Sequence, residues 1–540
     1  MAWSQGVSQA DWWEAYPSPE GWTQGRQALG QALITKLDQE GPAGLRPEGV
    51  AEREFRAWQW LGEWSNLQGQ SAREFVDLGK IPELIRAYLE NIASEDRRAE
   101  ALQILVQMQA NAPQEVKNLP RLAVALALVF DQPFPRTWPH PQVPVSAVPK
   151  EGVDPVVRLK EMAQLQSKRR YAFDLPDLNV SELKFLVDHP LPESEMEWAR
   201  KNVTTSRSSF DKVFQSIRYD FARLQGGVMT WPYPNYRLAD IREKGGICVD
   251  QGYFAAMAGK ARGLPTLFFT GQGESGGHAW FGYLDAPGRW VTDCGKYAEE
   301  NYPVGTALDP QTWKPITDTE LIFLAKGRER SDGYRQAKLW SDYASATGPE
   351  AGRKFLEAAL VLQPEFLPAW MTKGGWLDKA GDPQAKEEFW KSFVKRFARY
   401  PDLRVLGQEK LLELAKAKGD PQWAKNLERQ ILVQNRTKRF DLSIGATASQ
   451  VGEKIEAGDW AGAENAYRQA LREFKGQSGG HLFYGLVAPF VETALAEGQG
   501  KAAKSALQEA KRILKAGKET LVGKGLEQLE AEIKANQPSG

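Results

Sequence analysis

The sequence predicts a multidomain, mostly helical protein that contains one smaller α+β core. Three observations lead to this fold class. Apolar residues recur at helical spacing before residue 130, and short apolar runs separated by turn residues follow a single helix between residues 245 and 297. After residue 335, turns that begin with glycine recur at a nearly constant interval. We therefore expect a cysteine-bearing helix packed on an antiparallel sheet, with a helical domain before it and an α-solenoid after it.

Residues 1–130 are predicted to form the N-terminal helical domain. Phe55, Trp58 and Leu61 fall at helical spacing, and residues 81–92 and 99–110 form further amphipathic segments. The first 50 residues are expected to form an arm that packs onto later domains through its aromatic side chains. Its tryptophans are Trp3, Trp12, Trp13 and Trp22.

Residues 131–155 are predicted to be a stiff connector between domains. They contain seven prolines, including the Pro139-His140-Pro141 run, and a proline-rich segment favours an extended conformation. Residues 156–330 then form the core domain with its leading helices, in which Trp198 and Phe210 are candidate core residues.

The core begins with a helix from Val249 to about Ala261. Gly263 and Pro265 end this helix, because glycine terminates helices at little cost and proline cannot continue one. A strand follows at residues 267–269, then a glycine-rich segment at 271–277. Two more strands, at residues 278–284 and 289–293, are joined by the turn sequence Asp-Ala-Pro-Gly.

The predicted hairpin places a histidine and a carboxylate together. If the four turn residues form the whole loop, Leu284 pairs with Arg289, and Trp280 lies opposite Asp293. His278 then lies on the same face of the sheet as Asp293, on the diagonal, within reach of a hydrogen bond. A slip of one residue would put them on opposite faces.

Cys248 stands at the start of the predicted helix. The free N–H groups and the dipole of a helix start favour an anion, so we expect the pKa of this thiol to fall. Gly252, Ala255 and Gly259 form a face of small residues, which lets the helix lie close to the sheet and bring the sulfur to His278. The residues then suggest a triad: a cysteine nucleophile, a histidine base and an aspartate that orients the histidine.

This stretch resembles the transglutaminase-like superfamily, whose members share a papain-like Cys–His–Asp arrangement. The matching pieces, between about residues 210 and 313, are Gly246-x-Cys248, the Arg-Gly-Leu-Pro of residues 262–265, His278-Ala279-Trp280, and Trp290 three residues before Asp293. The resemblance implies that Cys248 is the nucleophile, His278 the base and Asp293 the orienting acid.

The chain departs from the family pattern at two places. Cys294 and Gly295 follow Asp293, where a proline often stands in the family. This departure leaves the role of Asp293 as the orienting acid open. No side-chain donor for the oxyanion is recognisable, and this leaves activity open.

Three aromatic residues are candidates for substrate binding. Trp280 is expected on the face of His278, where it is either a wall of the site or plain core. Trp231 and Tyr236 lead into the cysteine helix and are the other two candidates.

Several other features have simpler interpretations. Strand alternation turns Cys294 away from the face of Asp293, and no metal-ligand spacing is present, so we expect neither a metal nor a cofactor. The remaining histidines, His140, His189 and His481, are expected to be surface or packing residues. The glycine-rich segment lacks the context of a phosphate loop and is either a linker or a lid.

Residues 335–540 are predicted to form the α-solenoid. Gly381, Gly419, Gly458 and Gly498 are each followed by Asp or Gln and recur every 38 to 40 residues. The segment from residue 458 to 471 resembles the second helix of a tetratricopeptide (TPR) repeat, as does the stretch from residue 358 to 370. The resemblance implies a TPR-like array with a concave face that binds a protein partner.

Composition narrows the function further. Basic and acidic residues balance at 69 each, so we expect no nucleic-acid partner. The longest apolar run, residues 122–130, is too short to span a membrane. No basic segment followed by an apolar one opens the chain, so we expect a soluble protein, cytoplasmic by default, or periplasmic or secreted if a signal peptide has been removed. Both cysteines are expected to be reduced.

The sequence thus favours a thiol-dependent acyl-transfer enzyme that acts on peptide or protein amides. Water as acceptor gives a cysteine protease or amidase, which we favour because no acceptor site for an amine is recognisable. An amine as acceptor gives a protein-glutamine transglutaminase. A hypothesis from another class is a TPR-type scaffold or peptide-binding protein whose transglutaminase-like domain is catalytically silent.

Overall fold

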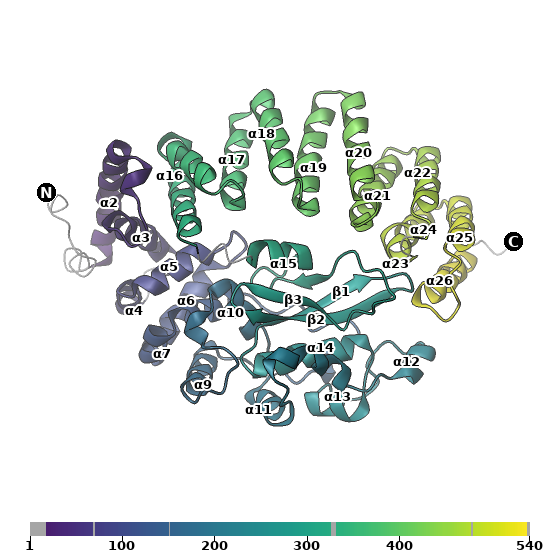
Figure 1. The fold of residues 1–540 in the computed structure, drawn as a ribbon, viewed down its shortest axis with the longest axis horizontal. Helices are drawn as coiled ribbons and strands as arrows, with labels where there is room; N and C mark the ends of the chain where they lie inside the picture. The colour runs from purple at the N-terminus through teal and green to yellow at the C-terminus, as the bar shows by residue number, and fades with distance from the viewer. Residues whose placement is uncertain (1–17, 68–70, 151, 326–330, 477–478, 537–540) are drawn as a thin grey trace.

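The computed structural model describes residues 18–67, 71–150, 152–325, 331–476 and 479–536. The protein is mostly helical and contains one five-stranded antiparallel sheet (Figure 1), which confirms the broad fold class. Trp3, Trp12 and Trp13 of the predicted arm lie outside the described residues. Trp22 is buried in the core.

Helices occupy the chain up to the sheet, and the predicted segments at 81–92 and 99–110 are confirmed. Proline is the first residue of several of them, where its fixed φ suits a helix and its missing N–H leaves no unpaired donor. The α-helices are α2 (Pro19–Glu40), α3 (Val50–Glu63), α4 (Ala72–Gly79), α5 (Pro82–Asn91), α6 (Arg98–Asn111), α7 (Pro113–Asn118), α8 (Pro120–Phe130), α9 (Pro155–Ser167), α10 (Val180–Val187), α11 (Glu193–Asn202), α12 (Phe221–Gln225), α13 (Leu238–Lys244) and α14 (Cys248–Ala261).

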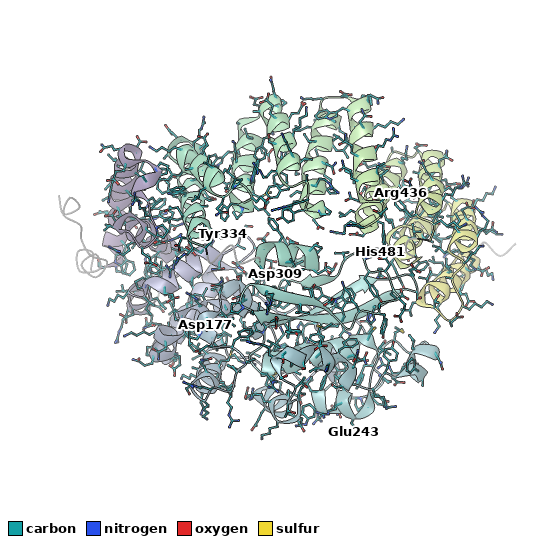
Figure 2. All side chains as sticks on the ribbon, in the orientation of Figure 1. Asp177, Glu243, Asp309, Tyr334, Arg436 and His481 are labelled. Carbon is teal, nitrogen blue, oxygen red and sulfur yellow. The ribbon has the colours of Figure 1, made fainter. Side chains whose placement is uncertain are left out.

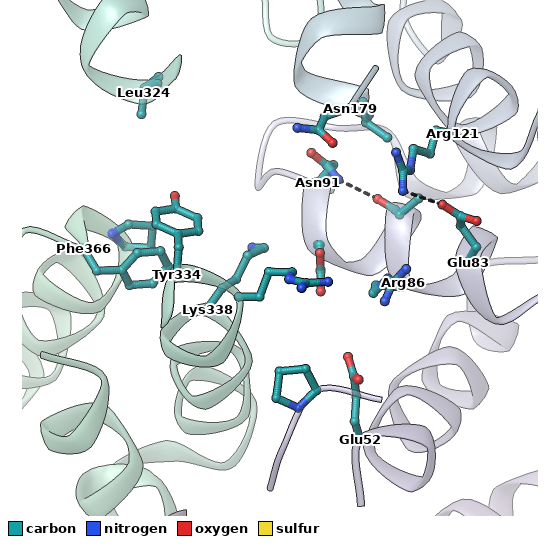
Figure 3. A pocket seen from close by; sticks show the side chains of 16 residues that line it. Glu52, Glu83, Arg86, Asn91, Arg121, Asn179, Leu324, Tyr334, Lys338 and Phe366 are labelled. Carbon is teal, nitrogen blue, oxygen red and sulfur yellow. Dashed lines mark hydrogen bonds and ion pairs between the residues drawn. The ribbon is translucent and has the colours of Figure 1, made fainter. Parts of the chain in front are cut away.

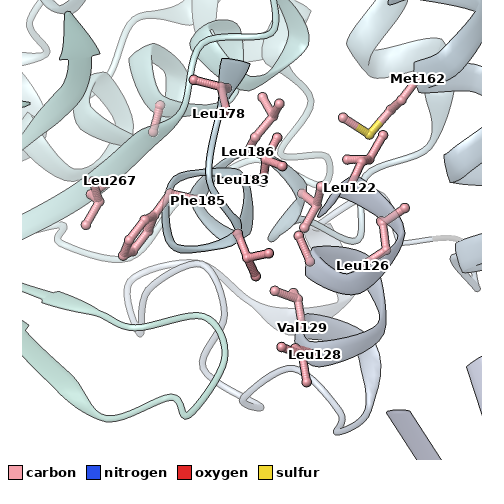
Figure 4. Packing of buried hydrophobic residues seen from close by; sticks show 14 of the residues in the cluster. Leu122, Leu126, Leu128, Val129, Met162, Leu178, Leu183, Phe185, Leu186 and Leu267 are labelled. Atoms are coloured by element: carbon pink, nitrogen blue, oxygen red, sulfur yellow. The ribbon is translucent and has the colours of Figure 1, made fainter. Parts of the chain in front are cut away.

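One hydrophobic cluster runs through residues 22–321. Residues 122–129 of α8 are all buried, and this helix packs against α5, α6, α9 and α10. Figure 4 shows its leucines beside Met162 of α9 and Leu183 and Leu186 of α10. The proline-rich stretch 131–155 belongs to the same cluster through Trp138, Val143 and Val148. The predicted boundary there does not separate two cores. Prolines lack an N–H donor, so an extended proline-rich chain can be buried with fewer unpaired groups.

The sheet has the strand order β3-β2-β1-β4-β5. Its strands are β1 (Thr266–Gln272), β2 (Gly277–Ala286), β3 (Arg289–Cys294), β4 (Thr306–Leu308) and β5 (Pro315–Thr317). Helix α14 packs on β1 and β2 through its small residues. A Cβ at Gly252 would lie 3.0 Å from the Phe268 ring, and one at Gly259 would collide with Thr266. The predicted close approach of this helix to the sheet is confirmed.

The predicted register of the β2–β3 hairpin is wrong. Leu284 pairs with Trp290 and Ala286 with Arg289, so the turn is the two-residue Pro287-Gly288. Gly288 has a φ of +76°, which glycine tolerates and which short hairpin turns use. The pairing of β2 with β3 shifts in register at two places, between Leu284 and Ala286 and between Phe281 and Tyr283. Such irregularities cannot be counted from strand lengths alone.

The C-terminal helices form one array of packed neighbours, here called the helical array. Its α-helices are α16 (Asp332–Leu362, interrupted at Gly348), α17 (Leu367–Ala380), α18 (Pro383–Arg396), α19 (Pro401–Ala417), α20 (Pro421–Asn435), α21 (Phe440–Glu456), α22 (Trp460–Glu473), α23 (Gly479–Leu482), α24 (Ala488–Ala496), α25 (Gly500–Leu514) and α26 (Leu521–Ala535). A π-helical segment, Phe483–Val487, joins α23 to α24.

The predicted glycine turns of the array are confirmed. Gly381, Gly419, Gly458 and Gly498 lie between consecutive helices with φ between +67° and +75°. This is the left-handed conformation in which glycine ends a helix. The aspartates that follow the first three glycines accept hydrogen bonds from backbone N–H groups at the start of the next helix.

The array crosses over the sheet from the N-terminal helices to the far end of β1 and β2 (Figure 1). At one end, α16 and α17 share a hydrophobic cluster with α2 and α3. In the middle, α15 (Asp318–Ala325) places Phe323 against Phe397 and Tyr400, with ring centroids 6.2 and 4.6 Å away. Part of the array is therefore covered by a helix of the same chain. None of the described helices has the length and apolar character needed to cross a bilayer.

Candidate active site

Cys248 is the first residue of α14, and close backbone contacts fix the chain just before it. The Gly246 N–H donates to the Arg218 carbonyl at 3.0 Å, and the Gly246 carbonyl accepts from the Asp220 N–H at 3.0 Å. Gly245 has a φ of +81°, and a Cβ there would lie 2.5 Å from the Arg218 oxygen. A side chain at position 245 is thus excluded by the neighbouring segment, and one at position 246 would collide with Asp250.

The thiol of Cys248 is buried, and burial raises its pKa to about 11. The backbone N–H groups of Ala279, Val249 and Cys248 itself oppose this rise in pKa, while the Asp250 carboxylate adds to it. The expected fall in the thiol pKa is wrong. A helix start stabilises a charge by about 0.3–1 kcal/mol, whereas two pKa units correspond to about 2.7 kcal/mol. The thiol is neutral near pH 7.

The imidazole of His278 is fixed by a backbone carbonyl. Its Nε2 lies 2.7 Å from the Gly295 oxygen. Because a carbonyl only accepts, Nε2 carries the hydrogen and Nδ1 keeps its lone pair. Burial lowers the pKa of His278, opposed by the Gly295 carbonyl and the Glu300 charge. The histidine is therefore neutral near pH 7, with Nδ1 able to accept a proton.

Cys248 and His278 lie on elements that pack together, α14 and β2, and they share aromatic neighbours. The backbone amide of Ala279, the residue that follows His278 on β2, acts on the Cys248 sulfur and opposes the rise in its pKa. Tyr297 stacks on the His278 ring with centroids 4.3 Å apart, and its phenol interacts electrostatically with the Cys248 sulfur. Tyr302 has the same two neighbours, with its ring centroid 5.5 Å from that of His278.

Asp293 does not join this pair. Its side chain is exposed, and its charge acts on Cys294 and Tyr283 instead. The prediction that Asp293 orients His278 failed because it rested on the four-residue turn. In the structure, the carbonyl oxygen of Gly295 is the partner of His278 Nε2.

The predicted substrate-binding residues have different positions. Trp280 lies beside His278, with ring centroids 5.9 Å apart, and its indole N–H donates to the Thr292 carbonyl at 2.8 Å. The two therefore share a face of the sheet as predicted, and Trp280, which is 0% exposed, is a core residue. Trp231 and Tyr236 are 2% and 0% exposed and belong to the core, so they have no surface for a substrate.

A buried polar network beneath the start of α14 was missed. Asp250 accepts from the Ile247 N–H at 2.8 Å, from Arg223 Nη1 at 2.8 Å and from the Tyr236 hydroxyl at 2.9 Å. His140 Nε2 lies 2.9 Å from the same hydroxyl. Asp250 is the third residue of α14, and an acidic residue near a helix start is a capping signal that sequence reasoning could have used.

A cavity of about 600 Å³ lies near the pair, and neither Cys248 nor His278 is among its lining residues. It shares Gly295 and Tyr297 with the surroundings of His278. Phe221 is 65% exposed and Tyr297 is 38% exposed, so the cavity presents aromatic surface to a ligand. Its other linings include Phe214, Tyr219 and Gln251.

A second cavity, of about 290 Å³, lies away from the thiol between α5 and the start of the array (Figure 3). Charged side chains line much of it, and Glu83 and Arg121 form an ion pair at 2.6 Å. Tyr334 and Phe366 give it an aromatic side. It contains neither cysteine nor histidine.

Cys294, His140 and His189 are buried side chains. Cys294 is buried and free, as is Cys248. His140 is buried, which lowers its pKa to about 3, and His189 is buried against Arg158. Within the described parts of the chain, no group of three His, Cys, Asp or Glu side chains could hold a metal ion.

Comparison of the chain with protein-family models, curated proteins and solved structures gives no match.

Proposed function

We propose that the protein is a thiol-dependent hydrolase of peptide or protein amides, with a papain-like core and a TPR-like array. The observation that carries this proposal is that Cys248 begins α14, which packs on the strand that carries His278, so that the backbone amides of Ala279 and of the helix start act on the sulfur. Such amides stabilise negative charge that develops on a nucleophile or an oxyanion. The resemblance of residues 210–313 to the transglutaminase-like superfamily adds support.

The protonation states favour general-base catalysis rather than a preformed thiolate. Both thiol and imidazole are neutral near pH 7. As the sulfur of Cys248 bonds to the amide carbon, Nδ1 of His278 accepts the thiol proton. The imidazolium then returns this proton to the leaving nitrogen as the carbon–nitrogen bond breaks. Water attacks the thioester, again losing a proton to His278, and the thiol is restored as the acid leaves.

Tyr219 is the candidate side-chain donor to the oxyanion. It lines the cavity, and its backbone forms a parallel bridge with Gly246, two residues before Cys248. Its phenol is close enough to the thiol for the two to interact electrostatically. Loss of one such donor typically slows turnover about 100- to 1000-fold.

The shape of the cavity supports a peptide substrate. A volume of about 600 Å³ with exposed Phe221 accommodates several residues of an extended chain.

A catalytically silent site with a scaffold role is the second candidate. The 9% exposure of Cys248 and its raised pKa favour it, because a reactive thiol is normally more accessible and more acidic.

Intact-mass measurement decides between these functions. Wild type, Cys248→Ala and His278→Ala would be incubated with glutamine-containing peptides, with and without a primary amine, and Cys294→Ala would serve as the matched control. Hydrolysis releases a peptide acid, transamidation releases an amine adduct, and a silent site gives neither. The proposal predicts peptide acid from wild type and Cys294→Ala only.

A labelling experiment provides a second test. Iodoacetamide should modify Cys248 faster than Cys294, at a rate that falls in His278→Ala. Equal rates at the two cysteines would argue against an activated thiol.

A further inference from the structure

The end of the helical array contacts the turn between β1 and β2. The carbonyl of Gly273 accepts from the Gly480 N–H of α23 at 3.0 Å, and the carbonyl of Ser275 accepts from the Val522 N–H of α26 at 3.4 Å. Backbone N–H groups in the first turn of a helix have no partner within that helix. The β1–β2 turn supplies the partners for these two.

Glycines make this contact possible. A Cβ at Gly480 would collide with the Gly273 oxygen, and a Cβ at Gly276 would lie 2.6 Å from the Leu521 side chain. A Cβ at Gly479 would lie 2.6 Å from the Glu274 oxygen. The glycine-rich segment, residues 271–277, is therefore a surface on which the array docks. It is neither the linker nor the lid expected from the sequence.

Two side chains of the array extend the contact. The imidazole of His481 hydrogen-bonds to the backbone of Gln272, and Figure 2 labels this histidine where the array meets the strands. Lys524 Nζ donates to the Leu224 carbonyl at 2.9 Å and to the Gln225 carbonyl at 3.3 Å, at the end of α12.

The β1–β2 turn leads directly into the candidate active site. Gly277 is the first residue of β2, His278 the second and Ala279 the third. The Ser275 N–H also donates to Glu300 Oε2 at 3.1 Å, and the Glu300 charge acts on His278. A displaced turn would thus move the imidazole, its charged neighbour and the Ala279 amide, which acts on the Cys248 sulfur.

We propose that the C-terminal end of the array is a positioning element of the thiol site. Gly480 and Leu521 hold the β1–β2 turn, and through it they fix His278 and Ala279 relative to Cys248. The kinetic part of this inference rests on the proposed function. The geometric part, that the array fixes the Ala279 amide, does not.

The test uses the full chain with Cys294→Ala as background. Gly480→Ala introduces the collision with Gly273, and Leu521→Ala removes the side chain beside Gly276, with Leu521→Met as its conservative rescue. Gly445→Ala in α21 is the matched control, because nothing lies within 4 Å of its added Cβ. Hydrogen exchange of the amides of residues 273–279 reports the geometry, and iodoacetamide alkylation of Cys248 from pH 6 to pH 10 reports the chemistry.

In Gly480→Ala and Leu521→Ala, the amides of residues 273–279 should exchange faster. The His278-dependent alkylation of Cys248 should slow about 10- to 100-fold, which is the scale expected when reacting groups are misplaced by about 1 Å. The alkylation profile should then match that of His278→Ala, and adding His278→Ala should change nothing further. Leu521→Met and Gly445→Ala should behave as wild type.

Unchanged exchange at Ala279 in both variants would overturn the inference. So would faster exchange that leaves the pH profile of alkylation intact. If wild-type alkylation does not depend on His278, the proposed function fails instead, and the exchange of Ala279 alone decides the positioning role. Leu521→Ala, which introduces no collision, decides the question if Gly480→Ala does not fold.

Discussion

The two halves of the molecule bury their side chains in different ways. In the globular half, residues 18–325, one hydrophobic cluster joins helices that are distant in sequence, such as α5, α8 and α10. In the helical array, residues 332–535, buried side chains fall into three separate clusters, two of which include a part of the globular half. A disturbance in the first half should reach the whole cluster, whereas one in the array should stay with its neighbours.

The largest expected effect is the loss of a buried charge in the globular half. Arg223→Leu leaves the Asp250 carboxylate, 1% exposed, without its ion pair, which should cost about 3–5 kcal/mol of unfolding free energy. In the array, Arg472→Leu removes an ion pair with Glu509 in which the arginine is 66% exposed, and it should change stability by less than about 1 kcal/mol. Denaturant unfolding measures both, and similar losses would contradict the comparison.

The next effect tests how α15 links the halves. Phe323→Ala removes the ring that contacts Phe397 and Tyr400, and it should cost about 3 kcal/mol, typical of a buried phenylalanine. Hydrogen exchange should show lost protection in α18 and α19 and unchanged protection in α14. Lost protection in both regions would mean that the halves unfold as one unit.

A smaller effect depends on pH and is confined to the globular half. Burial raises the pKa of Asp131 to about 7, and the neighbouring Asp96 and Glu100 charges contribute. The folded state thus binds more protons than the unfolded state between about pH 4 and pH 7, so stability falls as pH rises through this range. Asp131→Asn should remove this dependence and stabilise the protein at pH 8 by on the order of 2 kcal/mol, with no gain at pH 4.

Unfolding at pH 4, 6 and 8 measures the effect of Asp131→Asn. If the stability of the wild type rises between pH 5 and pH 7, and that of Asp131→Asn rises equally, Asp131 is not buried in its protonated form.

The smallest effect distinguishes two kinds of glycine in the array. Gly452 lies within α21 with open space around it, so Gly452→Ala should stabilise the protein by about 0.5–1 kcal/mol. Gly381 has the left-handed φ of +74°, and Gly381→Ala should destabilise by about 1 kcal/mol. Thermal unfolding of the two variants should shift in opposite directions.

Local features of the fold could be predicted from sequence. The cysteine helix, the hairpin strands and the glycine turns of the array each follow from a nearby pattern of turn and apolar residues. Features that depend on distant partners could not. The hairpin register changed because the turn used two residues, and this moved Asp293 away from His278.

The remaining differences have the same origin. The thiol pKa is dominated by burial, which no local motif reports. The pairing of Arg223 with Asp250 joins residues 27 positions apart, and the attachment of the array to the β1–β2 turn joins segments about 200 residues apart. Only the folded chain brings these groups together.

The attachment of the array at both ends has a mechanical consequence. A stack of helices with free ends can change its length and curvature, because each repeat contacts only its neighbours. Here α16 and α17 are fixed to α2 and α3, and α23 and α26 are fixed to the tip of the first hairpin. The array cannot lengthen between these two contacts unless one of them breaks. Bending of the array would therefore exert a force on β2, the strand that carries His278.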